Sequence, residues 1–171
     1  MTGQGELIAR QQVNDALIRY CWGIDRGDLK LVLSAFHDDA IDNHSGFEES
    51  AVERFTRTVA QASTMRTSHN LANVLIQLDG TRAGVQSYFT ARHQFDHEDK
   101  TFNWVIAGRY VDRFECRDAE WRIVHRTVVY DFEWFDEAGT RPIGHPAEPF
   151  LQHVVRGERG RSDYSFAVLR A

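Results

Sequence analysis

The first third of the chain repeats its hydrophobic residues every three or four positions, which is the spacing of an amphipathic helix. This spacing predicts one helix from residue 6 to about residue 25 and another from residue 48 to about residue 62. Between them, Asp28 has the side chain of an N-cap, which predicts a short helix directly after it. A short extended segment near residues 40–41 follows that helix.

From residue 67 onward the hydrophobic positions alternate with polar ones, as in strands that bury one face. Four long strands are predicted, with polar turns such as Asp79-Gly80 between them. They cover residues 67–78, 85–95, 102–116 and 121–135. The predicted order is therefore α-α-β-α-β-β-β-β, with strands longer than the usual five or six residues.

Helices followed by long antiparallel strands predict an α+β fold, in which three N-terminal helices pack on one face of a strongly curved, mostly antiparallel sheet. Long twisted strands curl around the helices, and the space between them can stay open as a deep pocket. Because the open side of such a sheet needs a cover, we expect a homodimer or a homotrimer.

The last segment, residues 136–171, has a different composition. All three prolines of the chain, Pro142, Pro146 and Pro149, lie in it, and a polar run at residues 156–161 follows them. We interpret the segment as an irregular arm over the pocket mouth or against a neighbouring subunit. A mobile terminus fits the same pattern equally well.

Composition narrows the function. Hydrophobic residues make up 42% and charged residues 26% of the 171 residues, which is typical of a globular protein. The net charge of -5 without a basic patch speaks against a nucleic-acid partner. The apolar stretches are too short to span a membrane, and the N-terminus lacks the pattern of a signal peptide. We therefore expect a cytoplasmic protein without a membrane partner.

Cofactor and metal chemistry have little support in the sequence. The two cysteines, Cys21 and Cys116, are too few for a disulfide framework or a zinc site, so two buried thiols are expected. Polar groups gather at residues 37–44, and His93 and His97 lie four apart, but neither set has a recognised ligand geometry. Neither a glycine-rich phosphate loop nor a Gly-x-Ser-x-Gly motif occurs. We expect no metal and no cofactor.

Asp25 breaks a local rule. It stands at the C-terminal end of the predicted first helix, where the helix dipole disfavours an anion by about 0.3–1 kcal/mol. Cys21 and Ile24 place it beside the apolar stripe, and Asp28 already caps the next helix. Such a residue is expected at a functional site. His69, at the start of the long strands, is its natural partner, because an imidazole bonded to a carboxylate keeps one tautomer and gains basicity.

Three short motifs, in this order and spacing, resemble the SnoaL-like branch of the NTF2-like superfamily. They are YCWGIDRGD at residues 20–28, SHN at residues 68–70 and EWRI at residues 120–123. The likeness is strongest to the group of scytalone dehydratase and hexachlorocyclohexane dehydrochlorinase, with bile-acid 7α-dehydratase as a further relative. It implies a cone-shaped, cystatin-like α+β barrel over residues 1–135, with residues 136–171 as a C-terminal arm of the same single domain.

The resemblance also implies roles for individual residues. Members of this group use an Asp at the end of the first helix and a His at the start of the long strands as a dyad, and these positions match Asp25 and His69. Scytalone dehydratase has a second pocket histidine, which His93 resembles. The dehydrochlorinase has an arginine that Arg126 matches, but a lysine where this chain has Tyr20. The bile-acid enzyme has a tyrosine there, so this departure favours dehydration.

Together these features predict a cofactor-independent lyase that performs a dehydratase-type β-elimination on a small hydrophobic cyclic substrate. His69 would remove a proton beside an activating group. Tyr20 and His93 would donate hydrogen bonds, and Arg126 would stabilise negative charge, provided that Arg126 and not His125 faces the pocket. Aromatic residues suit such a ligand. They include Tyr88, Phe89, Phe102, Trp104, Tyr130, Phe132 and Trp134.

Two alternatives remain open at this point. One is a polyketide cyclase or an isomerase that uses the same dyad for proton transfer. The other is a non-catalytic binding or assembly subunit, like the β subunit of a ring-hydroxylating dioxygenase. The non-catalytic reading predicts a filled cone, whereas an enzyme requires an open pocket with Asp25 and His69 within about 2.6–3.2 Å of each other.

Overall fold

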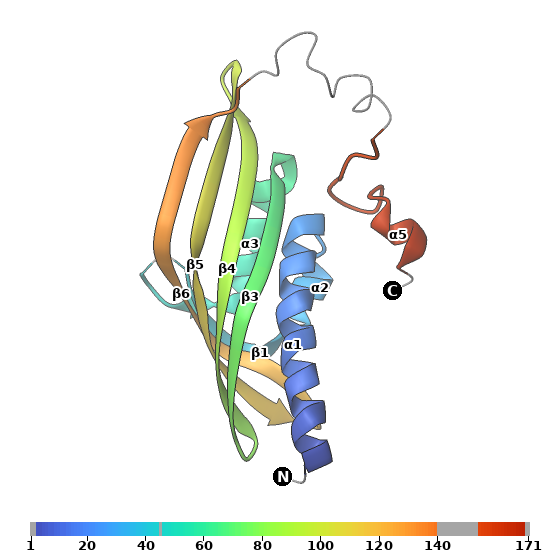
Figure 1. Cartoon of the computed structure of the whole chain (residues 1–171), viewed down its shortest axis with the longest axis vertical. Helices are drawn as coiled ribbons and strands as arrows, with labels where there is room; N and C mark the ends of the chain where they lie inside the picture. The colour runs from blue at the N-terminus through green and yellow to red at the C-terminus, as the bar shows by residue number, and fades with distance from the viewer. Residues whose placement is uncertain (1–2, 45, 140–153, 170–171) are drawn as a thin grey trace.

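Within the part of the chain that the computed structural model describes, residues 3–44, 46–139 and 154–169, six strands form one curved sheet with helices against one of its faces (Figure 1). The strand order is β2-β1-β6-β5-β4-β3. All neighbouring pairs are antiparallel except β1 and β6, which run parallel. The strands are β1 (Phe36–Asn43), β2 (Glu49–Ser50), β3 (Arg66–Asp79), β4 (Arg82–His97), β5 (Lys100–Arg117) and β6 (Glu120–Glu137).

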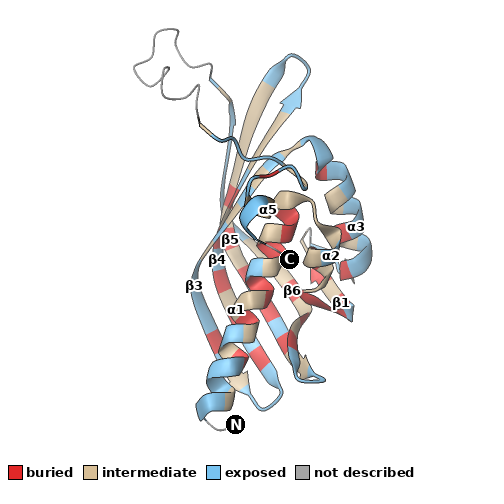
Figure 2. Ribbon diagram, turned by 90° about the vertical axis from the view of Figure 1, so that its right-hand side faces the viewer, coloured by how far each residue is buried: buried red, intermediate tan, exposed pale blue. Residues whose placement is uncertain are grey.

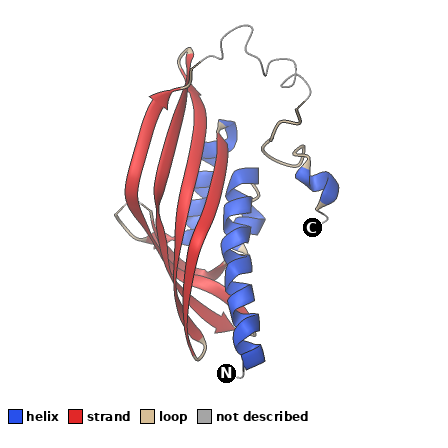
Figure 3. Cartoon of the chain, viewed as in Figure 1, coloured by secondary structure: helices blue, strands red, loops and turns tan. Residues whose placement is uncertain are grey.

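The helices follow the predicted apolar pattern (Figure 3). The buried residues of the first helix recur at three- and four-residue steps from Ala9 to Ile24. Asp28 caps the second helix as predicted, since its Oδ1 accepts a hydrogen bond from the backbone N–H of Leu31 at 3.0 Å. The helices are α1 (Gly3–Arg26), α2 (Leu29–Leu33), α3 (Ala51–Gln61), the 3-10 turn η1 (Ala62–Thr64) and α5 (Ser165–Val168).

The structure corrects the prediction between α2 and α3. The extended segment expected near residues 40–41 is the eight-residue strand β1. The third helix begins at Ala51 rather than at residue 48, because Glu49 and Ser50 pair with Asp42 and Ile41 of β1 before the helix starts. The α-helix ends at Gln61, close to its predicted end near residue 62, and the 3-10 turn η1 follows it directly. The four long strands lie where the alternation predicts them, as three successive antiparallel hairpins.

One irregularity in the sheet helps to shape its interior. Between β5 and β6, Gly108 opposes Tyr130 while Ala107 opposes Phe132, so Asp131 is an extra residue on β6. Such a bulge bends the strand and increases its twist. On the C-terminal and N-terminal sides of the extra residue, Phe132 and Tyr130 are both exposed, and Tyr130 also lines the interior cavity.

Buried residues concentrate along one side of α1 and in the halves of the strands next to it (Figure 2). The far ends of β4, β5 and β6 are much less buried. Four aromatic residues that were expected to suit a pocket, Tyr88, Tyr130, Phe132 and Trp134, are exposed, although Tyr130 also lines an interior cavity. The predicted homodimer or homotrimer stays a prediction. Of the two thiols, Cys21 is buried as expected, but Cys116 is only partly buried.

Part of the C-terminal segment contacts the end of α1. The guanidinium group of Arg26 lies 3.6 Å from the carboxylate of Asp163, and the rings of Trp22 and Phe166 are 5.0 Å apart. The backbone N–H of Gly160 donates to the Arg26 carbonyl oxygen at 2.8 Å. The residues from 154 to 169 therefore form an arm on the end of α1. The three prolines lie outside the described residues.

Two negative findings apply to the described ranges alone. No helix there is both long enough and apolar enough to cross a membrane. No three His, Cys, Asp or Glu side chains in those ranges come together as a metal site.

The bulge at Gly108 gives a stability prediction. A Cβ atom at this position would lie 2.0 Å from the backbone oxygen of Val129, so Gly108→Ala forces the two strands apart. We expect a loss of about 1–3 kcal/mol in the free energy of unfolding, since overpacking costs this much. Thermal unfolding then shows a melting temperature that is lower by roughly 2–10 °C.

Gly84 on the neighbouring strand β4 is the matched control. A Cβ atom there meets nothing within 4 Å, so Gly84→Ala should leave the melting temperature nearly unchanged. Equal melting temperatures for both variants would show that the close approach at Gly108 does not constrain the sheet.

Candidate active site

Asp25 and His69 meet where the end of α1 lies against the start of β3. The Nδ1 atom of His69 donates to Oδ1 of Asp25 at 2.7 Å, inside the separation that an enzyme requires. The backbone N–H of His69 donates to Oδ2 at 2.8 Å, and the hydroxyl of Thr67 donates to Oδ1 at 2.9 Å. The side chains of His69 and Asp25 are 6% and 11% exposed. Both carboxylate oxygens are thus held by the same stretch of β3.

The electrostatic balance keeps Asp25 ionised. Burial alone would raise the pKa of this carboxyl group. The hydrogen bonds from the side chain and backbone of His69, the attraction to His69 and the bond from Thr67 outweigh burial, and the pKa lies below its ordinary value. An ionised carboxylate only accepts hydrogen bonds, so the proton of the imidazole stays on Nδ1. In the neutral form of His69 the lone pair is therefore on Nε2.

An open cavity of about 250 Å³ lies in front of this pair, between α1, α3 and the inner faces of β3 to β6. His69, His93, Tyr20 and His44 contribute polar groups to its wall, and Arg54, Thr58 and Gln61 line it from α3. The larger part of the wall is nevertheless apolar. Apolar lining residues include Ile24, Phe55, Phe89, Ile106 and Val128. A mostly apolar cavity with a few convergent polar groups is typical of a site for a small molecule.

His93 and Trp104 lie beside the dyad on neighbouring strands. The rings of His93 and His69 have centroids 5.7 Å apart, and Nδ1 of His93 donates to the backbone oxygen of Trp104 at 3.4 Å. Burial, together with the charge of His69, lowers the pKa of His93 to about 4. His93 is therefore neutral at pH 7. Trp104 lines the cavity, and its indole N–H donates to Glu133 at 3.2 Å.

Arg126 does not hold the position that the sequence suggested. It is on the inner face of β6, whereas His125 points away and pairs with Glu48 at 2.9 Å. However, Arg126 does not line the cavity. Its side chain is fully buried behind Tyr20, and its Nε and Nη2 atoms donate to the two oxygens of Asp112 at 2.8 and 2.7 Å. Arg126 therefore has no place on the cavity wall, and its predicted role in stabilising negative charge stays a prediction.

Arg126 instead supports the tyrosine. Its guanidinium carbon lies 4.2 Å from the ring centroid of Tyr20 and 4.1 Å from that of Tyr110, in cation–π geometry. Burial raises the pKa of Tyr20, and the nearby guanidinium partly offsets this effect. Tyr20 is consequently a neutral hydroxyl group at the cavity wall.

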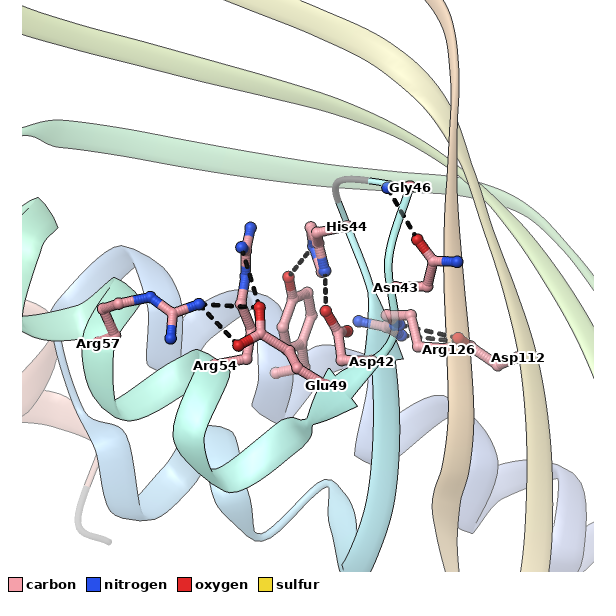
Figure 4. A network of polar contacts seen from close by, with 10 residues as sticks. Asp42, Asn43, His44, Gly46, Glu49, Arg54, Arg57, Asp112 and Arg126 are labelled. Atoms are coloured by element: carbon pink, nitrogen blue, oxygen red, sulfur yellow. Dashed lines mark hydrogen bonds and ion pairs between the residues drawn. The ribbon is translucent and has the colours of Figure 1, made fainter.

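Several residues near the cavity were not assigned to it from the sequence, among them His44 and Arg159. His44, directly after β1, lines the cavity, and it hydrogen-bonds to Asp42 (Figure 4). The sequence showed both residues in a polar cluster but gave no sign that His44 faces the cavity. Arg159, in the C-terminal arm, donates to the backbone oxygen of Ile24 at 2.9 Å, one residue before Asp25. A polar run without periodicity gave no reason to place it there.

With this geometry established, comparison with known proteins defines the class. Residues 5–127 match the family described as the SnoaL-like domain. The chain therefore belongs to the SnoaL-like family, as its motifs predicted. A search of curated protein sequences finds no significant match.

Several solved structures share the fold. A protein proposed to be a scytalone dehydratase, from Novosphingobium aromaticivorans, has 21% identity and a TM-score of 0.69, over 85% of this chain and 99% of that one. The hexachlorocyclohexane dehydrochlorinase LinA-type3 from Novosphingobium barchaimii has 15% identity and a TM-score of 0.69, over 85% and 100%. A protein of unknown function with a cystatin-like fold, from Nostoc punctiforme, has 18% identity and a TM-score of 0.59, over 71% and 90%.

At these identities the likeness shows the fold alone. The predicted α+β fold of the NTF2-like and cystatin-like type is confirmed. Lyases are among the structural relatives, and so are proteins without an assigned activity.

The pair of Arg126 and Asp112 gives a second stability prediction. Arg126→Met leaves the Asp112 carboxylate buried without a partner, and Asp112→Asn leaves the guanidinium group without its counter-charge. Each single variant should lose about 3–5 kcal/mol in the free energy of unfolding. The double variant should lose clearly less than the sum, because it removes both charges. Urea denaturation measures all four proteins, and additive losses would mean that the two charges do not depend on each other.

His93 predicts a pH dependence of stability. In the unfolded chain its pKa is about 6.5, whereas in the folded protein it is about 4. Between these values the unfolded chain binds more protons, so the free energy of unfolding falls as the pH is lowered from about 6.5 to about 4. We expect His93 to account for about 1–3 kcal/mol of this fall.

Urea denaturation at pH 7 and at pH 4.5 measures the effect. His93→Gln should lose this part of the pH dependence, whereas His97→Gln, at the exposed end of the same strand, should keep the wild-type dependence. If His93→Gln keeps the same slope as the wild type, His93 is not neutral in the folded protein.

Proposed function

We propose that this protein is a cofactor-independent lyase that performs β-elimination with His69 as the base. The observation that carries the proposal is the pairing of His69 with an ionised Asp25 at the wall of an open cavity. The Nε2 atom removes a proton from a carbon next to an activating carbonyl group, and Asp25 stabilises the imidazolium that forms. The leaving group departs from the adjacent carbon.

The cavity argues for the size and character of the substrate. An apolar cavity of about 150 Å³ holds one benzene ring. The cavity of about 250 Å³ therefore suits a compound of one or two fused rings better than a four-ring steroid. Its apolar wall favours a hydrophobic substrate, and the few polar groups near His69 fix the orientation.

Two further groups orient the substrate in this proposal. Neutral His93 donates its Nδ1 proton to the Trp104 backbone oxygen, so its Nε2 atom accepts a hydrogen bond from a substrate hydroxyl group and does not stabilise negative charge. Tyr20 offers a hydroxyl group. The structural relatives described as a scytalone dehydratase and a dehydrochlorinase support the same class of reaction. An open cavity is also what an enzyme requires, whereas the non-catalytic alternative predicted a filled cone.

A test uses two bicyclic ketones. α-Tetralone has no leaving group, and in D2O the protein should catalyse exchange of its α-protons, which proton NMR measures. With β-hydroxytetralone the protein should form naphthol by loss of water, and the absorbance of the naphthol measures this reaction. His69→Gln should reduce both rates by about 10²–10⁴-fold, since a positioned base contributes this much. Asp25→Asn should reduce both rates as well.

His125→Gln is the matched control, because His125 pairs with a carboxylate outside the cavity. It should leave both rates unchanged, and circular dichroism should show all variants folded. Proton exchange without elimination would favour the isomerase or cyclase alternative. Unchanged rates in a folded His69→Gln variant would refute the assignment of the base.

A further inference from the structure

A second histidine–carboxylate pair lies in the same cavity and has no role in the proposed elimination so far. The Nδ1 atom of His44 hydrogen-bonds to Oδ1 of Asp42, and His44 lines the cavity together with His69 (Figure 4). The Asp42 side chain is fully buried, and that of His44 is 14% exposed. The arrangement therefore repeats that of the first dyad, with a buried carboxylate behind an imidazole.

Asp42 is costly to bury. Among the described residues its Oδ1 atom has His44 as a hydrogen-bond partner, and its Oδ2 atom has none. A buried carboxylate oxygen without a hydrogen-bond partner destabilises the fold, so its presence calls for an explanation. The purpose that its one partner indicates is to orient the imidazole and to stabilise its protonated form.

Tyr20 connects this second pair to the ligand space. The hydroxyl oxygen of Tyr20 lies 3.3 Å from Nε2 of His44, and both residues line the cavity. The ring of Tyr20 is fixed under the Arg126 guanidinium group and against Phe55, with ring centroids of the two aromatic residues 5.4 Å apart. The hydroxyl group is therefore held in one place, between His44 and the cavity.

The charges around His44 suit a group that releases a proton. Burial lowers its pKa, Asp42 acts in the opposite direction, and Arg126 and Arg54 add to the lowering. The lowered pKa favours the neutral form of His44, so the relay acts in molecules in which His44 has taken up a proton, a fraction that grows as the pH is lowered. That imidazolium gives up its proton readily. Tyr20 has a raised pKa, so it passes a proton on only when another donor replaces it.

We propose that Asp42, His44 and Tyr20 form a relay that protonates the leaving group, on the part of the cavity wall formed by α1 and β1, while the pair of Asp25 and His69 acts as the base. This inference rests on the proposed elimination. It assigns the acid and the base to two different histidines. The second pair is needed when the leaving group is a hydroxyl group, which departs poorly without a proton.

The step balances as follows. His69 takes the proton from the substrate carbon, the electron pair of that C–H bond forms the C=C bond, and the C–O bond breaks. The departing oxygen takes the hydroxyl proton of Tyr20, and Tyr20 takes the Nε2 proton of His44. The products are the alkene and water, with His69 protonated and His44 neutral. Both histidines return to their first state by proton exchange with solvent.

The leaving group provides the test. Chloride departs without a proton, whereas hydroxide needs one, so β-chlorotetralone and β-hydroxytetralone separate the two dyads. With the hydroxyl compound, His44→Gln should reduce kcat/KM by about 10²–10⁴-fold, the contribution of a general acid. With the chloro compound, corrected for spontaneous elimination, the same variant should lose less than about fivefold. Tyr20→Phe keeps the ring and should show the same selectivity.

His69→Gln and His125→Gln complete the set. His69→Gln should lose activity on both compounds, and His125→Gln on neither. Equal losses on both compounds in His44→Gln and Tyr20→Phe, or no loss on either, would overturn the relay while leaving the proposed base intact. A folded His69→Gln variant with full activity would instead refute the elimination itself, so the two failures are distinguishable. If His44→Gln does not fold, Tyr20→Phe alone decides the question by the same comparison.

Discussion

The site depends on one buried carboxylate at the end of the first helix. Asp25 stands where the helix dipole opposes its charge, and it is accommodated because the start of β3 supplies three hydrogen bonds to it. Two of these bonds come from His69. The same bonds join α1 to the edge of the sheet, so the contact that holds the helix in place also orients the imidazole. The geometry of the candidate site and the stability of the fold are therefore coupled at this point.

The rest of the interior divides into a packed part and an open part. Near β1, the inner face is filled by aromatic rings and by the buried pair of Arg126 and Asp112. Toward the far ends of the hairpins, the sheet bends away from the helices at the bulge beside Gly108, and the cavity lies in between. The arginine supports Tyr20 from behind, although it does not reach the cavity itself. The rings of Tyr20 and Tyr110 thus lie between its charge and the cavity.

Local patterns predicted most of the fold. The three- and four-residue spacing gave α1, the side chain of Asp28 gave the start of α2, and alternation gave the four long strands. What the sequence did not show depends on long-range pairing. The parallel contact of β1 with β6 has no local signal, and the two-residue strand β2 exists only because β1 is beside it.

The site was predictable to the same extent. Asp25 was recognisable because it violates a local rule, and His69 because of the motif around it. The partner of Arg126 was not, since Asp112 is brought to it by the register of β5 and β6. His44 and Asp42 were seen as a polar cluster, but their hydrogen bond depends on the bend that follows β1, which has no local signal in the sequence.

The central claim is that Asp25 holds the proton of neutral His69 on Nδ1 and leaves a lone pair on Nε2 toward the cavity. Nitrogen-15 NMR of the labelled imidazole measures this tautomer directly in the ligand-free protein. The account predicts that neutral His69 is protonated on Nδ1 and unprotonated on Nε2, and that Asp25→Asn abolishes this preference. A neutral His69 that carries its proton on Nε2 would contradict the account.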